Sequence, residues 1–357
     1  MAVTVFHAVS AVLVPPAPDA RLPRRLWRRR IRASPHPNRT GVRMSDSINS
    51  KPIPRSILIF GAAGHIGRPL AEFLHREAPQ IQLRLVSSNP ERVEALQRDF
   101  PKAEVVHADY FDLPSLESAV RGIEGVFVNT PGRTDERRAM TNVVTALQKA
   151  GTAVHVLRTV GLQPEANERR LPQFVREADN GLALPVQHPI VKRIFDESDL
   201  PVTYLNIGAT FMDNFFWMKG SLVSERKLIW HNRLIPFIDP RDIAEVAGRL
   251  LLSDNHRHIG QFHTLNNGHD LMRFSDVAEL MTQVFGERIT HDGSKEKFLA
   301  TYNPLFGGDA SGLWGFFEYE RENEVVWARN DFVERTLGRK PLTLREWLQE
   351  HAQLLLN

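Results

Sequence analysis

The chain of 357 residues is long enough for one large domain or two modest ones, and its 42% apolar and 24% charged residues are ordinary for a globular protein. The absence of cysteine excludes disulfides, thiolate nucleophiles and cysteine-bound metals, and it fits a reducing compartment, either the cytoplasm or an organelle matrix. The formal charge of +3 is unevenly distributed, because residues 1–50 carry +7 and the remainder carries −4. A mildly acidic body argues against nucleic acid as a partner.

Residues 1–50 are predicted to be a disordered, Arg-rich leader. Prolines 23, 35 and 37 interrupt an acid-poor stretch with too little apolar surface to offset the entropy of ordering. Three interpretations stay open: an over-long reading frame whose natural start is Met44, an organelle transit peptide, or a basic interaction arm. Nowhere does the chain reach the roughly 18 uninterrupted apolar residues of a membrane span, so no membrane association is expected.

From residue 56 onward, apolar runs alternate with amphipathic patterns, which is typical of repeated βαβ units in a parallel sheet. The expected strands are 56–60, 82–87, 103–107, 125–129, 153–159 and 202–206, and the expected helices are 65–76, 90–99, 114–121, 134–150 and 187–198. Short strands that are apolar on both faces belong in a sheet covered by helices on each side. The predicted fold class is therefore α/β, with a Rossmann-type doubly wound parallel sheet over residues 55–207.

Beyond residue 207 the rhythm changes, and residues 208–357 are expected to form a smaller α+β lobe that covers the substrate. Within it, residues 235–252 read as a short strand and a helix that return to the first domain, and "QFHTLNNG" reads as another strand. Two later helices have start signals, namely Asp276 with Glu279 and Thr343 with Glu346.

The stretch "SILIFGAAGHIGRPLAEFL" takes a strand into three glycines and then into a helix. Directly after a strand, Gly61 permits a sharp turn, Gly64 lets the backbone approach a pyrophosphate, and Gly67 allows close packing of helix on sheet. The amides of His65 and Ile66 would then point at phosphates from a helix N-terminus. The alternative is a glycine-rich turn with no ligand, but the position at the first βα junction favours a dinucleotide cofactor.

The end of the second expected strand bears on which dinucleotide binds. An acidic residue there would hold the 2′-hydroxyl of NAD, whereas a basic residue would accept the 2′-phosphate of NADP. This chain has Ser87, Ser88 and Asn89, which offer no repulsion to a phosphate, and Arg92 or Arg68 could contribute to binding it. NADP(H) is therefore favoured, with NAD(H) as the alternative.

Four stretches of the chain form a recognisable set: "GAAGHIG", "HADYFDLPSLESAVRGIEGVFVNTP", "HPIVKRIFDESDLPVTYLNIGATFMDN" and "IPFIDPRDIAEVA". Together they resemble the NmrA-like branch of the atypical short-chain dehydrogenases, and the likeness extends over about residues 55–357. That group includes quinone oxidoreductases, ergot-alkaloid dehydrogenases and NAD(P)-sensing regulators. The resemblance implies a set of cofactor-binding residues at successive strand ends: Asp109 and Tyr110 near the adenine, Asn129 and Thr130 beside the nicotinamide half, and Thr159 facing the nicotinamide and substrate.

The chain departs from the classical short-chain dehydrogenases, which use a tyrosine four residues before a lysine as the proton donor. None of its four tyrosines has a lysine at that spacing, whereas His188 precedes Lys192 by four residues on one helix face. The resemblance implies that Lys192 binds the cofactor ribose or serves in proton transfer, and His188 could donate a proton near neutral pH. The alternative is a solvent-facing lysine and a structural histidine.

These observations favour an NAD(P)H-dependent oxidoreductase that reduces a small, aromatic or quinone-like acceptor by hydride transfer. The aromatic runs 211–218 and 312–320 would suit such a substrate, but they would equally suit the core of the second lobe. The alternative function is a non-catalytic NAD(P)-sensing regulator that acts through a protein partner. No metal site is expected, because His256 and His258 lie in a polar loop without further ligands at suitable spacing.

Overall fold

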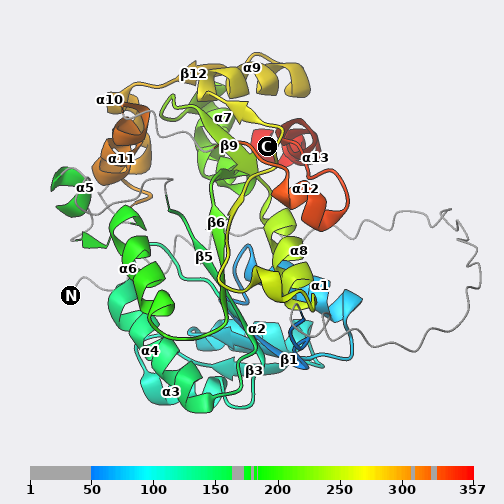
Figure 1. The fold of residues 1–357 in the computed structure, drawn as a ribbon. Helices are drawn as coiled ribbons and strands as arrows, with labels where there is room; N and C mark the ends of the chain where they lie inside the picture. The colour runs from blue at the N-terminus through cyan, green and yellow to red at the C-terminus, as the bar shows by residue number, and fades with distance from the viewer. Residues whose placement is uncertain (1–49, 163–172, 178–180, 183, 307–309, 323–327) are drawn as a thin grey trace, which may run out of the picture.

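The computed structural model describes residues 50–162, 173–177, 181–182, 184–306, 310–322 and 328–357. The predicted leader therefore lies outside the described residues except for Ser50. A seven-stranded parallel sheet forms the lower part of the molecule in Figure 1, and a smaller lobe of short strands and helices lies above it. The fold class is the one that the sequence predicts.

The large sheet has the strand order β10-β6-β5-β4-β1-β2-β3. Its strands are β1 (Ser56–Phe60), β2 (Gln82–Ser87), β3 (Glu104–His107), β4 (Gly125–Val128), β5 (His155–Val160), β6 (Val202–Ile207) and β10 (Phe262–Leu265). The first six lie within two residues of their predicted bounds, and β10 is the strand expected in "QFHTLNNG". Because every pair is parallel, the carboxyl ends of all seven strands meet at one edge, where such sheets bind ligands.

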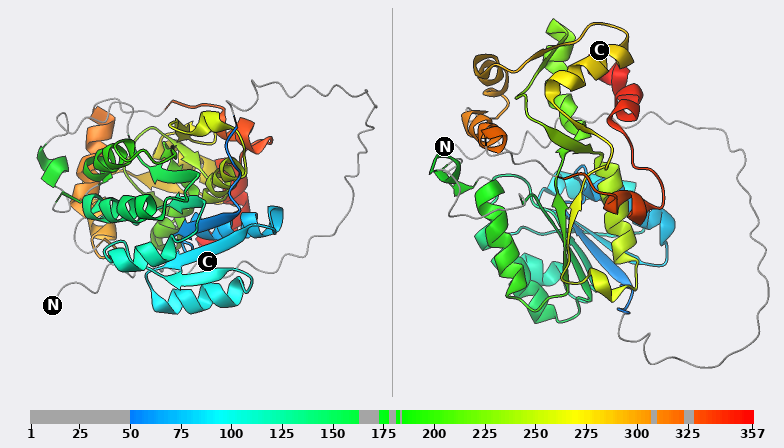
Figure 2. Two further views of the ribbon diagram at one scale, coloured as in Figure 1. Left: turned by 60° about the horizontal axis from the view of Figure 1, so that its bottom comes forward. Right: turned by 45° about the horizontal axis from the view of Figure 1, so that its top comes forward.

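Helices cover both faces of this sheet, as the two further views also show (Figure 2). One layer contains α1 (Gly67–Glu77), α2 (Pro90–Asp99), α8 (Pro240–Leu251) and α12 (Phe332–Leu337), and the other contains α3 (Leu113–Ala119), α4 (Glu136–Ala150) and α6 (Leu184–Asp196). Side chains of β1 alternate between them: Ile57 and Ile59 enter the first core, and Leu58 and Phe60 enter the second. All four are buried, which explains why these strands are apolar on both faces.

Helices α1 and α8 pack closely although they are far apart in sequence. At Gly248 of α8, an added Cβ would lie 2.3 Å from a ring carbon of Phe73 in α1. Only glycine therefore lets the Phe73 ring lie against the α8 backbone, and the contact fixes the helix that begins at the glycine loop.

The second lobe has two small sheets and an aromatic core. The sheets are β7 (Thr210–Phe211), β9 (Ile235–Ile238) and β11 (Leu271–Met272), and β8 (Lys227–Ile229) with β12 (Thr290–Asp292). Its helices are η3 (Met212–Met218), α7 (Lys219–Glu225), α9 (Phe274–Phe285), α10 (Lys295–Tyr302), α11 (Ala310–Glu322) and α13 (Leu344–Leu356). The segment 235–252 divides between the two parts, because β9 pairs with β7 and β11 while α8 packs on α1.

The two predicted helix starts have different outcomes. Thr343 and Glu346 form a capping box at the start of α13, as predicted. The prediction for Asp276 is wrong by one turn: α9 begins at the buried Phe274, and the Asp276 carboxylate accepts from the amide of Arg273 at 3.0 Å. Within the described residues, no helix is both long and apolar enough to cross a membrane.

Candidate functional site

The glycine loop between β1 and α1 has the geometry of an anion cradle. Gly61 adopts a φ of +68°, which side-chain-bearing residues rarely adopt. At Gly67 an added Cβ would lie 2.2 Å from the carbonyl oxygen of Gly61, so α1 can start against this turn only with glycine there. The amides of His65 and Ile66 donate no hydrogen bond to the described residues and remain open at the N-terminus of α1. These features fit a bound pyrophosphate.

The end of β2 lies beside this loop, and local hydrogen bonds hold it in place. The side chain of Asn89 caps α2 by accepting from the amides of Glu91 and Arg92, at 2.8 and 3.4 Å. The amide of Asn89 in turn donates to the hydroxyl of Ser87 at 3.1 Å. The carboxamide oxygen of Asn89 is thus already engaged, whereas the side chain of Ser88 is exposed.

The two arginines proposed from the sequence for a 2′-phosphate differ in their surroundings. Arg68 donates to Asp99 at 2.5 Å and lies 3.4 Å from a carboxylate oxygen of Glu72, so its charge is already balanced. Arg92 is half-buried in the first turn of α2, and its guanidinium forms no ion pair with the described residues. Of the two, Arg92 is the cation left for a ligand.

The predicted residues after β3, β4 and β5 form a connected group. The hydroxyl of the partly buried Tyr110 donates to the carbonyl of Asn129 at 2.9 Å, and desolvation raises the pKa of this tyrosine above its ordinary value. The hydroxyl of Thr159 lies 2.7 Å from the side-chain oxygen of Asn129. The carboxylate of Asp109 accepts from the amide of Phe111 at 2.8 Å and so shapes the turn after β3. Asn129 and Thr159 therefore line the carboxyl edge together.

Below this edge lies an ion pair that the sequence reasoning missed. Arg158 of β5 donates to Glu136, the first residue of α4, at 2.7 Å, and their side chains are 0% and 1% exposed. The Thr130 hydroxyl lies between them, because it donates to Glu136 and accepts from Arg158. The available signal was a charged residue inside a strand expected to be buried on both faces, and Arg158 in "HVLRTV" is such a residue.

His188 of α6 packs against this pair and does not fit the predicted role of a proton donor near neutral pH. Its Nδ1 accepts from the amide of Gly161 at 2.7 Å, which leaves the ring proton on Nε2, 4.0 Å from Glu136. Burial, together with the charge of Arg158, lowers the pKa of His188 to about 3. The neutral ring instead fixes the backbone that follows β5.

Lys192 is not brought together with these residues. Its ammonium group lies 2.5 Å from Asp196, one turn further along α6, and 5.1 Å from the ring centre of Tyr204 in β6. The side chain is 38% exposed. Lys192 follows His188 by one turn of α6, and it is His188 that contacts Gly161, directly after β5. These contacts favour the structural reading of this residue.

The side chain of His65 reaches from the glycine loop to the second lobe. Its Nδ1 lies 2.7 Å from a carboxylate oxygen of Asp213, at the start of η3, and its ring packs edge-on against Phe211. The second lobe is therefore joined directly to the cradle.

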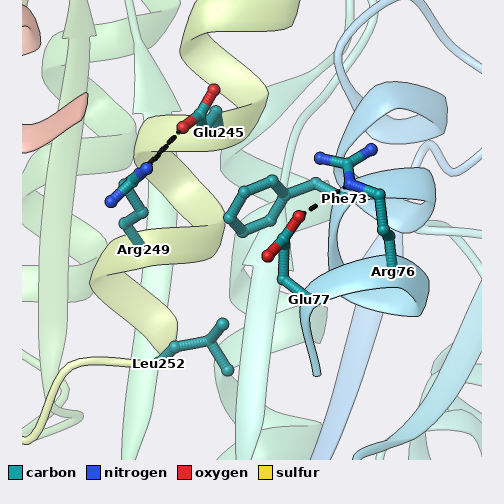
Figure 3. Close-up of a pocket in the computed structure, with 6 residues that line it drawn as sticks. All are labelled: Phe73, Arg76, Glu77, Glu245, Arg249 and Leu252. Carbon is teal, nitrogen blue, oxygen red and sulfur yellow. Dashed lines mark hydrogen bonds and ion pairs between the residues drawn. The ribbon is translucent and has the colours of Figure 1, made fainter. Parts of the chain in front are cut away.

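A surface groove between the far ends of α1 and α8 is unrelated to this edge. It is lined by Phe73, Arg76, Glu77, Glu245, Arg249 and Leu252, and its charged residues pair with one another (Figure 3). Across the described residues, no cluster of three or more histidine, aspartate or glutamate side chains could hold a metal ion.

Comparisons with known proteins agree with this geometry. The model of a family described as NAD(P)H-binding matches residues 61–214. The chain is 25% identical over 311 residues to the (4-alkanoyl-5-oxo-2,5-dihydrofuran-3-yl)methyl phosphate reductase of Streptomyces griseus, covering 83% of this chain and 98% of the relative. It is 23% identical over 287 residues to an NmrA-like family domain-containing oxidoreductase of Penicillium ochrochloron, covering 73% and 80%.

The crystal structure of an NADPH-dependent quinone oxidoreductase from Escherichia coli, complexed with NADPH, has the same fold. It superposes with a TM-score of 0.68 at 21% identity and covers 82% of this chain and 99% of that one. Sheet, loop and family match together define an NAD(P)H-binding protein of the Rossmann type. The chain is similar to the NmrA-like proteins, because the Penicillium relative carries that family name and residues 61–214 match the NAD(P)H-binding model. At the level of class, the comparisons support an NAD(P)H-dependent oxidoreductase.

Proposed function

We propose that the protein is an NADPH-dependent reductase of a small, flat, conjugated acceptor such as a quinone or an aromatic enone. The observation that carries the proposal is the glycine cradle, with open amides at His65 and Ile66, on the same sheet edge as the Asn129–Thr159 pair. The family match and the reductase relatives support it.

The preference for NADPH over NADH rests on the end of β2. No acidic side chain follows that strand directly, Ser88 is exposed, and Arg92 has no ion-pair partner among the described residues. A 2′-phosphate would form charge-assisted hydrogen bonds with such an arginine. Replacing Arg92 by alanine should therefore raise the KM for NADPH by about tenfold while leaving the KM for NADH within about twofold. The matched control is Arg98→Ala, at the exposed far end of α2.

The acceptor is proposed to bind between the carboxyl edge and the second lobe. Most of the aromatic side chains that the sequence offered for stacking are committed to the core of that lobe, among them Phe215, Trp314 and Phe317. Phe216 and Trp217 are only partly buried and remain candidates for contact with a flat substrate. The relatives named above act on a furanone phosphate and on quinones, which are conjugated carbonyl compounds.

A conjugated acceptor suits a site without a dedicated acid. Bound NADPH supplies the hydride, and the protein orients it and excludes water. Three tyrosine hydroxyls have structural partners: Tyr110 donates to Asn129, Tyr204 to Asp196, and Tyr302 to Ile229. A quinone can take its proton from solvent after hydride transfer, because the charge is delocalised over the ring.

The test is steady-state oxidation of NADPH and NADH with a panel of quinones, enones and imines. Thr159→Val removes one hydroxyl at nearly constant volume and should lower kcat/KM by about tenfold or more, because the Asn129 side chain loses its fixed position. Lys192→Ala is the matched control and should change kcat/KM by less than about twofold, because its ammonium group contacts only Asp196 and the Tyr204 ring among the described residues. Tight nucleotide binding without turnover of any acceptor would refute the reductase.

That outcome would favour the second candidate, a nucleotide-sensing regulator that acts through a protein partner. One observation supports it: His188 is buried and neutral, and the hydroxyls of Tyr110, Tyr204 and Tyr302 are engaged, so none of these groups serves as a proton donor beside the Asn129–Thr159 pair. The two candidates share the same cradle, so binding alone does not separate them.

A further inference from the structure

The contact between His65 and Asp213 is a direct link between the nucleotide cradle and the second lobe. His65 lies between Gly64 and Ile66, and its open amide faces the cradle. Its side chain leaves the loop toward the second lobe, where Nδ1 lies 2.7 Å from Asp213. One residue thus contributes a backbone donor to the cradle and a side chain to the other lobe.

The position of Asp213 is fixed by the small sheet of the second lobe. The residue follows β7, in which Phe211 is paired with Ile238 of β9. Phe211 also contacts the imidazole of His65 edge-on, with ring centres 4.8 Å apart. The ring of His65 is therefore held on one side by an aromatic edge and on the other by a carboxylate.

Each partner has one polar atom without a hydrogen bond. Nε2 of His65 makes none with the described residues, and the side chain is 39% exposed. The second carboxylate oxygen of Asp213 is buried and also has no partner in the described part of the chain. The pair is thus incomplete on both sides, and an imidazolium donor remains available at the cradle.

The charges around His65 favour its protonated form. Burial lowers the pKa of His65, but the hydrogen bond to Asp213 and the charges of Asp213 and Asp239 outweigh this effect, so the pKa lies above its ordinary value. Asp239 caps α8 and is itself paired with Arg241 at 2.8 Å. Arg68, on the first turn of α1, is engaged by Asp99 and Glu72 and does not contact the ring.

We propose that His65 is a nucleotide-binding residue through its side chain as well as its amide: its imidazolium, held by Asp213, lies between that carboxylate and the dinucleotide pyrophosphate. Without the imidazolium, the carboxylate of Asp213 would face the phosphates with like charge. The proton on His65 therefore strengthens nucleotide binding, and binding draws a proton from solvent when the ring is neutral beforehand. This inference rests on the nucleotide binding proposed above but not on turnover.

The first test is the dissociation constant of NADPH, measured by fluorescence titration between pH 7 and 9. The nucleotide's own 2′-phosphate, with a pKa of about 6, is already mostly ionised at pH 7 and adds little slope over this range. For the wild type, the constant should rise by about tenfold as the pH increases, equivalent to about 1.4 kcal/mol. At both pH 7 and pH 9, His65→Gln should bind NADPH with the weaker affinity that the wild type has at pH 9.

Asp213→Asn separates this role from simple loss of structure. It keeps the shape of the side chain but removes the charge that holds the proton on His65. The rise of about tenfold in the NADPH dissociation constant should therefore occur at lower pH than in the wild type. The control His75→Gln, at the exposed end of α1, should retain the wild-type profile. Thermal unfolding of each variant identifies any that are not folded.

The second test is calorimetry of NADPH binding at pH 8 in buffers with different ionisation enthalpies. The wild type should take up a fraction of one proton per nucleotide, and His65→Gln should take up none. Equal proton uptake and equal pH dependence in the wild type and His65→Gln would overturn the inference while leaving nucleotide binding intact. No NADPH binding by the folded wild type would instead refute the proposed function.

Discussion

The buried pair of Arg158 and Glu136 allows a stringent test of how the sheet edge is held. Replacing Arg158 by methionine leaves the Glu136 carboxylate buried. Its Oε1 then keeps only the hydrogen bond from the Thr130 hydroxyl. Its other oxygen, Oε2, has no partner among the described residues even in the intact protein. Breaking such a pair from one side costs about 3–5 kcal/mol, because an uncompensated charge remains in a medium of low dielectric constant.

For a domain of this size the loss should lower the thermal midpoint by roughly 6–15 °C. The double variant Arg158→Met, Glu136→Gln removes both charges and should recover at least half of the lost free energy of unfolding, because a buried pair replaced as a whole is often nearly neutral. The control Arg55→Met breaks the exposed contact with Glu124 and should change the midpoint little.

The assay is urea unfolding at pH 7.5, followed by circular dichroism, with NADPH affinity measured in parallel. The single variant Glu136→Gln is measured alongside. If the double variant lost as much free energy as Arg158→Met and Glu136→Gln added together, the two residues would not interact and the reasoning would be refuted.

Two further predictions follow from the same geometry. Gly67→Ala should abolish measurable NADPH binding, since its Cβ would lie 2.2 Å from the Gly61 carbonyl oxygen. The control Gly220→Ala, at a position where an added Cβ meets nothing within 4 Å, should bind NADPH normally. Equal NADPH affinities of the two variants in a fluorescence titration would contradict the role of the loop. Burial lowers the pKa of both His155 and His188 to about 3, against about 6.5 in the unfolded chain, so stability that is present above pH 6.5 should decline as the pH falls toward 3. At pH 5 the loss should be about 2 kcal/mol per histidine, seen as a lower urea midpoint than at pH 7.5, and an unchanged midpoint would show that these rings are not neutral in the folded protein.

The large sheet was predictable from sequence because its signal is local. Each strand such as "SILIF" is a short apolar run, and each is followed by an amphipathic helix, so period and order together fix the parallel arrangement. The glycine loop was predictable for the same reason, since Gly61 is required by its own positive φ, and Gly64 and Gly67 by their close approach to the Gly61 carbonyl.

The remainder of the site depends on contacts between distant segments. The pairing of Arg158 with Glu136 crosses 22 residues, and the pairing of His65 with Asp213 crosses 148. Spacing alone placed His188 and Lys192 on one helix face. It did not show that the His188 ring would be buried near Arg158, or that the Lys192 ammonium group would pair with Asp196. Residue type identified candidates, whereas burial and partners determined their roles.

The edge strand β10 and helix α8 have a consequence for the order in which the protein forms. Both belong to the nucleotide-binding half, yet in the chain they follow three strands of the second lobe, β7, β8 and β9. A ribosome must therefore release residues 240–265 before α1 acquires its packing partner and β6 its outer neighbour. During synthesis the glycine loop emerges early, before α8 is available to pack on α1. The ability to bind nucleotide is therefore expected to arise late, when both halves of the molecule are nearly complete.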